Sequence, residues 1–213
     1  VENTSSANAV YIGGRVGYAN SITITNTSTN ANIIVNTTSS GQVNAGGLIG
    51  YMGAGTVDKC YTTGNVTAST DKGAIYAGGL IGNKNSSSRV YITNVYTTSK
   101  VIATSNSGTI YIGGLSGYSN TMTVQQAYVV GKVIATSDSG KVYAGGIFGT
   151  GSGITISSLY WSPETTGQDT SISGTSKMFQ SMLYKSTYEG WDFDSIWAIE
   201  EGESLPYLKD MNK

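Results

Sequence analysis

Gly78-Gly79-Leu80-Ile81-Gly82 is one copy of a Gly-Gly-x-x-Gly frame, the most regular feature of this chain. The frame occurs five times, at residues 13–17, 46–50, 78–82, 113–117 and 145–149. Successive Gly-Gly pairs lie 33, 32, 35 and 32 residues apart. A period of this length is typical of small units that stack and bury their apolar faces against one another. The sequence therefore predicts an array rather than a domain with a single centre.

The segments between the frames have the pattern of short strands. Val66-Thr67-Ala68 recurs as Val101-Ile102-Ala103 and as Val133-Ile134-Ala135, and period-two alternation places Val66 and Ala68 on an inward face. The stretches 69–73, 105–108 and 137–140 that follow are turn sequences. In these turns we expect Asp or Asn to bond the local backbone and Gly to adopt a positive φ. Another strand then leads into the next Gly-Gly pair.

The predicted fold class is all-β, a β-solenoid. No amphipathic helical pattern occurs before residue 170, and each unit has about three short strands. We expect a right-handed parallel β-helix of about five 32-residue coils. Antiparallel hairpins or a propeller are the rival arrangements. The glycines are interpreted as bends or close backbone contacts, because no helix follows them as a phosphate-binding loop would require.

The pattern changes near the C-terminus. Met178, Phe179, Met182 and Leu183 have the spacing of two helical turns, and Trp191, Phe193, Trp197, Leu205 and Leu208 follow within an acidic stretch. A solenoid must cover its terminal coil, so we expect residues 1–169 to form the repeat solenoid and residues 170–213 to form a cap packed on the last coil. A carbohydrate-binding platform is the alternative for these aromatic residues.

Charge and hydropathy limit the partners. Charged residues make up only 12% of the chain and the formal net charge is -1. Residues 1–163 carry eight Lys and Arg, which are too dilute for a phosphate-binding stripe, so no nucleic acid partner is expected. No apolar run of about 18 residues occurs, so we expect no membrane insertion by this fragment. The chain opens on Val1 close to the first Gly-Gly pair, as part of a longer polypeptide would.

The sequence offers little material for catalysis or metal binding. The repeat region offers a polysaccharide-cleaving β-helix only scattered carboxylates, such as Asp58, Asp71, Asp138 and Glu164. Histidine is absent, and Cys60 is the only cysteine; its column also holds Val95, Ala127 and Leu159, so we expect a small buried apolar residue there. Zinc sites, catalytic triads and EF-type calcium loops therefore lack ligands. We expect no enzyme activity, no catalytic residues, no metal and no cofactor.

Tyrosine columns are the candidate binding feature. One column holds Tyr11, Tyr76, Tyr111 and Tyr143, and a second column holds Tyr18, Tyr51 and Tyr118. Equivalent residues of a solenoid stack into ladders along its axis. If these ladders face outward, their ring faces and hydroxyls suit glycans or proteins, and if they face inward they belong to the core. The sequence leaves both orientations open.

Gly46-Gly47-Leu48-Ile49-Gly50 followed by Tyr61-Thr62-Thr63-Gly64-Asn65-Val66 resembles the GLUG-motif repeat family. The tail, with Gly190-Trp191-Asp192-Phe193, Ile196-Trp197 and Leu205-Pro206-Tyr207-Leu208, is similar to the segment that closes many arrays of that family. Arg15, Ser116 and the degenerate first copy depart from the usual pattern. The resemblance implies a non-catalytic module of a bacterial surface protein, such as an adhesin or an immunoglobulin A peptidase.

These observations predict an extracellular module at a cell surface that acts in adhesion or as a structural stalk. Its expected partners are glycans or surface proteins of a host or a neighbouring cell. A carbohydrate-binding or polysaccharide-degrading β-helix is the alternative. Ice binding is a weaker alternative, because it needs Thr in one column of every coil, and the column of Thr63 and Thr98 continues as Val130 and Ser162.

Overall fold

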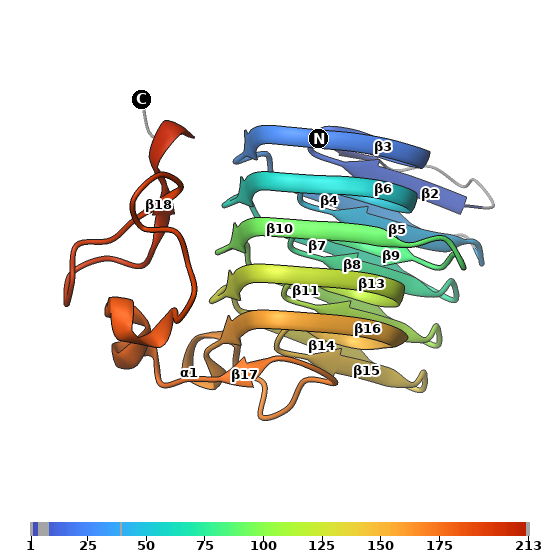
Figure 1. Ribbon diagram of the computed structural model, residues 1–213. Helices are drawn as coiled ribbons and strands as arrows, with labels where there is room; N and C mark the ends of the chain where they lie inside the picture. The colour runs from blue at the N-terminus through green and yellow to red at the C-terminus, as the bar shows by residue number, and fades with distance from the viewer. Residues whose placement is uncertain (1, 4–8, 39, 212–213) are drawn as a thin grey trace.

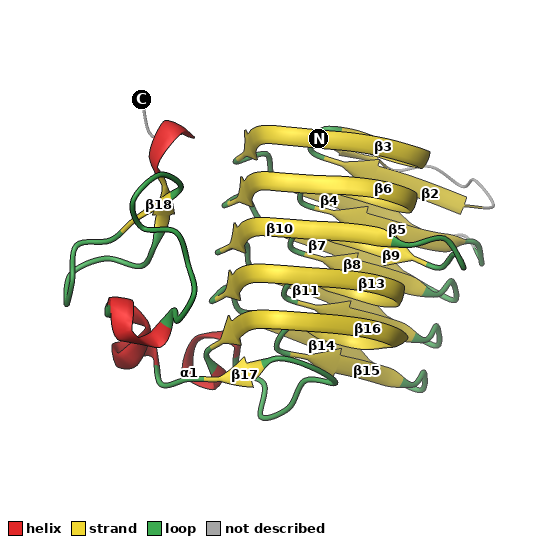
Figure 2. Ribbon diagram, in the orientation of Figure 1, coloured by secondary structure: helices red, strands yellow, loops and turns green. Residues whose placement is uncertain are grey.

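The computed structural model describes residues 2–3, 9–38 and 40–211, and its main body is a stack of five coils (Figure 1). Strands of successive coils pair in parallel and form three sheets that run along the stack (Figure 2). The predicted β-solenoid is confirmed. Parallel pairing of every repeat strand that the structure describes contradicts the hairpin and propeller alternatives, which need antiparallel neighbours.

The coils build three sheets, here named A, B and C; each coil contributes one strand to each sheet, except that the third coil contributes two shorter strands, β9 and β10, to sheet C. Sheet A contains β1 (Glu2–Asn3), β4 (Ile33–Thr37), β7 (Val66–Thr70), β11 (Val101–Ser105) and β14 (Val133–Ser137). Sheet B contains β2 (Ala9–Gly13), β5 (Gln42–Gly46), β8 (Ile75–Gly78), β12 (Ile110–Gly113) and β15 (Val142–Gly145). Sheet C contains β3 (Val16–Thr29), β6 (Ile49–Thr62), β9 (Ile81–Lys84), β10 (Val90–Thr97), β13 (Ser116–Val129), β16 (Phe148–Trp161) and β17 (Thr175–Ser176).

The coils stack in the register that the repeat alignment predicts. Tyr111 of β12 pairs with Tyr76 of β8 and with Tyr143 of β15. The three additional residues of the third repeat lie in the loop between β9 and β10, where the longer strand of the other coils is interrupted. The insertion therefore lengthens a surface loop and leaves the register of the other strands unchanged.

The Gly-Gly pairs allow close backbone contact between coils. A Cβ atom on Gly79 would lie 2.2 Å from the carbonyl oxygen of Gly114, and one on Gly47 would lie 2.0 Å from that of Gly79. None of the frame glycines, all of which the structure describes, has a positive φ. These positions therefore need glycine because no side chain fits between the coils, and the backbone angles alone do not demand it.

The third glycine of the frame brings sheet C against sheet B. A Cβ atom on Gly82 would lie 2.6 Å from the backbone nitrogen of Ala45, and one on Gly117 would lie 2.6 Å from that of Ala77. No side chain can therefore separate the two backbones at this crossing. The contact divides the interior of each coil, and two separate hydrophobic cores result.

The two cores are built from repeated columns of apolar residues. The core between sheets A and B includes Ile33, Val35, Val66, Ala68, Ile75, Ala77, Val101, Ala103, Ile110 and Ile112. The second core is enclosed by the bent strands of sheet C and by the Gly-Gly corners. It includes Leu48, Ile49, Met52, Val57, Leu80, Ile81, Val95, Leu115, Val124 and Phe148. The inward placement predicted for Val66 and Ala68 is confirmed, because both are buried.

The turns between sheets A and B differ from the prediction in the residues that bond the backbone and in the conformation of the glycine. The hydroxyls of Thr70, Ser105 and Ser137 accept hydrogen bonds from the backbone N–H three residues later, a role expected for Asp or Asn. The glycine in this turn does not have a positive φ. A Cβ atom on Gly108 would lie 1.9 Å from the carbonyl oxygen of Gly73, so stacking of adjacent turns is what requires glycine here.

Sheet C bends at a residue of left-handed conformation in every coil. These residues are Asn26, Lys59, Asn94, Gln126 and Ser158, with φ between 49° and 53°. The long strands β3, β6, β13 and β16 continue on both sides of this residue. The parallel pairing skips this residue in each coil and resumes at the next one, so the left-handed residue turns the strand while the register is kept on both sides of it.

The C-terminal segment packs on the last coil and along the side of the stack. It contains α1 (Pro163–Thr166), η1 (Phe179–Leu183), η2 (Lys185–Thr187), β18 (Trp197–Ala198), β19 (Tyr207–Leu208) and η3 (Lys209–Met211). β17 pairs with β16 of the last coil, whereas the residues after it run back along the side of the stack toward the N-terminal coils (Figure 1). Within the predicted stripe, Phe179–Leu183 form a 3-10 helix rather than two turns of α-helix, and Met178 precedes it in an extended conformation.

A column of stacked tyrosines explains this lateral course. Tyr61, Tyr96 and Tyr128 stack with ring centroids 4.7 and 5.1 Å apart, and they present one apolar strip across several coils. The segment covers this strip with Trp191, Trp197, Tyr188, Met182 and Leu208. The Trp197 Nε1 donates to the Asn94 Oδ1, and the Tyr128 hydroxyl donates to the Pro206 carbonyl. The segment therefore packs on the last coil, where Tyr188 and Trp191 contact Tyr160, and also extends along the side over Tyr96 and Tyr128 of earlier coils, which the sequence did not predict.

Substitution of Gly79 with Ala is expected to destabilise the solenoid by at least ~2 kcal/mol, because the added methyl group overlaps a backbone carbonyl that cannot move without separating the coils. Chemical denaturation followed by circular dichroism measures the effect. Gly167→Asn is the control, since Gly167 has φ 69° with no heavy atom within 4 Å of an added Cβ, and Asn tolerates that conformation. Equal stability of the two variants would contradict the close-contact explanation.

Trp197→Ala is expected to release the C-terminal segment from the tyrosine strip, since Trp197 is fully buried and its indole also bonds Asn94. Loss of a buried Trp costs ~3–5 kcal/mol, whereas Tyr184→Ala, at an exposed site, should be nearly neutral. Limited proteolysis should cut residues 178–211 of the Trp197 variant first and leave the solenoid intact. Simultaneous loss of both parts would show that the segment is essential to the solenoid itself.

Candidate functional site

The tyrosine columns that flank the Gly-Gly frame face outward. Tyr11, Tyr18 and Tyr143 expose 37%, 49% and 40% of their surface, and Tyr51, Tyr76, Tyr111 and Tyr118 are half-buried. The structure thus decides between the two orientations that the sequence left open. We call these seven residues the tyrosine surface.

The two columns meet along the crossing of sheets B and C. Within a column the rings stack, with centroids 4.9 Å apart for Tyr76 and Tyr111 and 5.1 Å apart for Tyr111 and Tyr143. Between columns the rings meet edge to face, as Tyr111 and Tyr118 do at 5.7 Å and 89°. Each ring is therefore held by neighbouring rings in favourable geometry before any partner binds.

Two asparagines divide the tyrosine surface. Asn44 and Asn83 occupy tyrosine positions of the second and third coils, and both side chains are buried. The Asn83 Nδ2 donates to the Asn44 Oδ1 at 2.7 Å, and the Asn44 Nδ2 donates to the Val10 carbonyl. A shorter polar side chain can reach the backbone here, which a tyrosine ring cannot do. The surface consequently has one group of three rings and one group of four.

Three hydroxyls of the tyrosine surface, those of Tyr51, Tyr76 and Tyr111, stay protonated at neutral pH and can donate hydrogen bonds. Partial burial, followed by the effect of neighbouring tyrosines, raises the pKa of Tyr51, Tyr76 and Tyr111. The Tyr18 hydroxyl donates to the Asn20 Oδ1 at 2.7 Å. The surface thus combines flat apolar faces with neutral polar groups, which suits recognition of uncharged hydroxylated or peptide partners.

The scattered carboxylates form no catalytic cluster in the described part of the chain. Asp58 lies on β6 and accepts from Asn94, whereas Asp71 lies in a turn after sheet A and accepts from Asn106. Glu164 accepts from the backbone of Phe179. Asp138 lies in a turn after β14. Among the residues described, no group of three His, Cys, Asp or Glu side chains is positioned to hold a metal ion.

Cys60 is buried, as its column predicts. Its thiol donates to the Asp58 carbonyl at 3.2 Å, and burial raises its pKa to about 11. A thiol with this pKa carries little thiolate at neutral pH and is a weak nucleophile. The described residues also contain no helix that is long and apolar enough to cross a membrane.

Lys84 is a buried charged residue that the sequence analysis did not single out. It follows Asn83 in β9, its side chain is fully buried, and its Nζ donates to the Ser86 carbonyl in the inserted loop. Burial and the nearby Arg89 lower its pKa to about 8. The paired residue of the next coil is Ser119, which is also buried. The three additional residues of the third repeat, in the loop after β9, were the feature of the sequence that could have indicated an unusual environment for Lys84.

No protein-family model, curated protein or solved structure matches this chain. The structure therefore defines the class of protein as a β-solenoid array with an outward tyrosine surface. The resemblance to the GLUG-motif family remains a prediction.

Lys84 is expected to make stability depend on pH. Because its pKa falls from the usual 10.5 to about 8, the unfolded chain binds more protons than the folded chain between these values. The destabilising effect of the charge is fully present below pH 8 and is lost as the pH rises toward 10.5. We expect Lys84→Met to unfold at a higher temperature than the parent at pH 7 and at a similar temperature at pH 10.

The matched control for this measurement is Lys72→Met, which removes an exposed charge from a turn. Its difference in melting temperature from the parent should not change with pH between 7 and 10. A constant difference for Lys84→Met as well would contradict a lowered pKa at this position.

Proposed function

We propose that this chain is a non-enzymatic, extracellular β-solenoid module of a larger bacterial surface protein that binds a glycan or a surface protein through its tyrosine surface. The observation that carries the proposal is the outward orientation of all seven tyrosines. Surface aromatic residues gathered on one face of a molecule mark interaction sites more often than scattered ones do. Adhesion to a host or a neighbouring cell is the corresponding function.

The geometry of the tyrosine surface favours an extended partner. The stacked rings recur about every 5 Å along the solenoid axis, as the centroid distances within the columns show. A partner that also extends along the axis can contact several coils at once, so weak contacts add up. Because neighbouring rings already hold each side chain, binding would cost little conformational entropy.

A structural stalk is the second candidate function. Its support is the continuous parallel hydrogen bonding from coil to coil, which includes the corners, where the Leu48 N–H donates to the Leu80 carbonyl and the Leu80 N–H donates to the Leu115 carbonyl. Such a stack holds its ends at a fixed distance, as a spacer must. The separate positions of Asp58, Asp71 and Asp138 give no support to a polysaccharide-cleaving site, which needs carboxylates on one wall.

Replacing Tyr76, Tyr111 and Tyr143 together with Ser is expected to abolish binding to the glycan or host protein that an array screen of the parent chain identifies. Three exposed or half-buried rings contribute most of the larger tyrosine group, and interface tyrosines are frequent hot spots. The far-ultraviolet circular dichroism spectrum should stay unchanged, because the backbone ladders and both cores are retained.

Tyr91→Ser is the matched control, since Tyr91 is 50% exposed and is not one of the seven residues of the tyrosine surface. Binding by the triple variant at the strength of the parent would contradict the proposed surface. Consistent absence of binding by the parent chain across the array would favour the stalk.

A further inference from the structure

The first coil departs from the repeat at two positions that lie close together in space. Arg15 stands where the later frames have a buried Leu48, Leu80 or Leu115, and it is exposed. Ser28 pairs with Tyr61 at the position where the later coils have the covered tyrosine column. The Arg15 Nη2 donates to the Ser28 carbonyl at 3.0 Å, which joins the two departures in one site.

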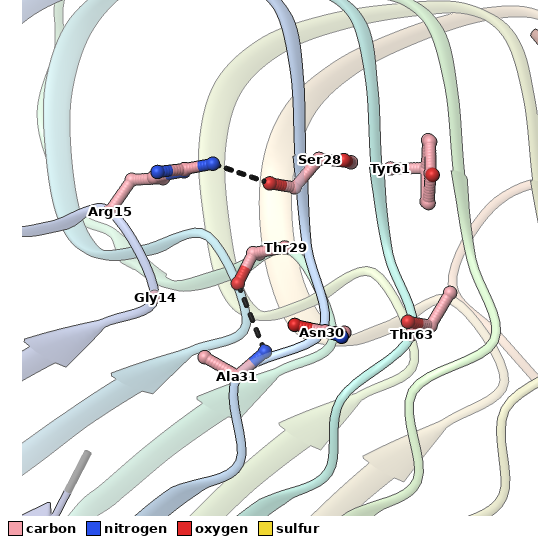
Figure 3. A pocket seen from close by; sticks show the side chains of 8 residues that line it. All are labelled: Gly14, Arg15, Ser28, Thr29, Asn30, Ala31, Tyr61 and Thr63. Atoms are coloured by element: carbon pink, nitrogen blue, oxygen red, sulfur yellow. Dashed lines mark hydrogen bonds between the residues drawn. The ribbon is translucent and has the colours of Figure 1, made fainter. Parts of the chain in front are cut away.

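These two departures border a pocket of about 520 Å³. Small-ligand sites have volumes of ~300–1,000 Å³. The lining residues are Gly14, Arg15, Ser28, Thr29, Asn30, Ala31, Tyr61 and Thr63 (Figure 3). This pocket lies beside the first end of the covered tyrosine column and shares no residue with the tyrosine surface, so it is a separate site.

One wall of the pocket is the ring of Tyr61, which has no stacking partner on the face directed toward the first coil. Tyr61 stacks on Tyr96 at 4.7 Å and 4°, and in the opposite direction its paired residue is Ser28. Figure 3 shows the Tyr61 ring edge-on, with Ser28 beside it where another ring would continue the column. The space left by the missing ring has the size and orientation to receive a flat ring from a ligand.

The opposite wall supplies a positive charge. In Figure 3 the Arg15 guanidinium lies on the other side of Ser28 from the Tyr61 ring. A guanidinium has five N–H donors, and the bond to the Ser28 carbonyl uses one. None of the eight lining residues carries a negative charge. The exposed side chains of Asn30 and Thr63 add neutral donors and acceptors.

We propose that this pocket binds a saccharide ring that carries a carboxylate, a uronic acid residue of an acidic glycan. The apolar face of the sugar ring packs on Tyr61, and the carboxylate pairs with the Arg15 guanidinium. The sugar hydroxyls reach Asn30 and Thr63. A single guanidinium beside one ring fits a single carboxylated sugar, whereas a nucleic acid backbone requires several cations.

Isothermal titration calorimetry of the parent chain with tetragalacturonate tests this proposal, and the fully methyl-esterified tetramer is the matched uncharged ligand. The ester keeps the ring faces and removes the charge. We expect the acid to bind at least ~10-fold more tightly than the ester, as the loss of a charge-assisted hydrogen bond implies.

Two variants separate the two walls. Arg15→Leu restores the residue of the later frames and should remove the preference for the acid over the ester. Ser28→Tyr restores the column, fills the space over Tyr61 and should abolish binding of both ligands while circular dichroism and the melting temperature show an intact fold. Arg89→Leu removes the same charge from an exposed loop and should bind as the parent does.

The proposal is overturned if the parent binds neither ligand, if it binds acid and ester equally, or if Ser28→Tyr binds as tightly as the parent. The triple variant of Tyr76, Tyr111 and Tyr143 should keep acid binding at the strength of the parent. Failure of this pocket and failure of the tyrosine surface are therefore distinguishable in the same set of titrations.

Discussion

Backbone contact without intervening side chains sets the geometry of the whole solenoid. At the Gly-Gly corners one coil lies against the next, and at the third glycine sheet C lies against sheet B. A single Cβ atom at Gly79 or Gly82 would overlap main-chain atoms. Because these contacts recur at the same position of every coil, they fix the spacing of the stack and divide its interior into two narrow cores.

The same repetition gives each side chain a column of copies, and the surroundings of the column decide its role. The column of Tyr61, Tyr96 and Tyr128 is covered by the C-terminal segment and stabilises its attachment. The column of Tyr76, Tyr111 and Tyr143 has no such cover in the described structure and remains accessible. Identical stacking geometry thus serves a structural purpose on one side of the solenoid and presents a surface on the other.

Departures from the repeat produce the individual features of an otherwise regular molecule. Asn44 and Asn83 divide the tyrosine surface, and the longer third repeat encloses the ammonium group of Lys84. Arg15 and Ser28 create a pocket where the later coils are filled. In each case the backbone ladder tolerates the change, because the parallel hydrogen bonds do not depend on side-chain identity.

The period, the register and the need for glycine at the corners could be predicted from the sequence, because they depend on the identity of repeated residues. The inward face of Val66 and Ala68 could be predicted as well, because it depends on local alternation. The sequence could not determine that the tyrosine surface faces outward, because the strands there are apolar on both faces. It predicted a cap packed on the last coil, whereas the segment also covers the side of the earlier coils. Both the exposure of the tyrosine surface and the course of the C-terminal segment depend on contacts between residues far apart in the sequence. Trp197 and Leu208 cover the column of Tyr96 and Tyr128, and no such residues cover the tyrosine surface in the described structure.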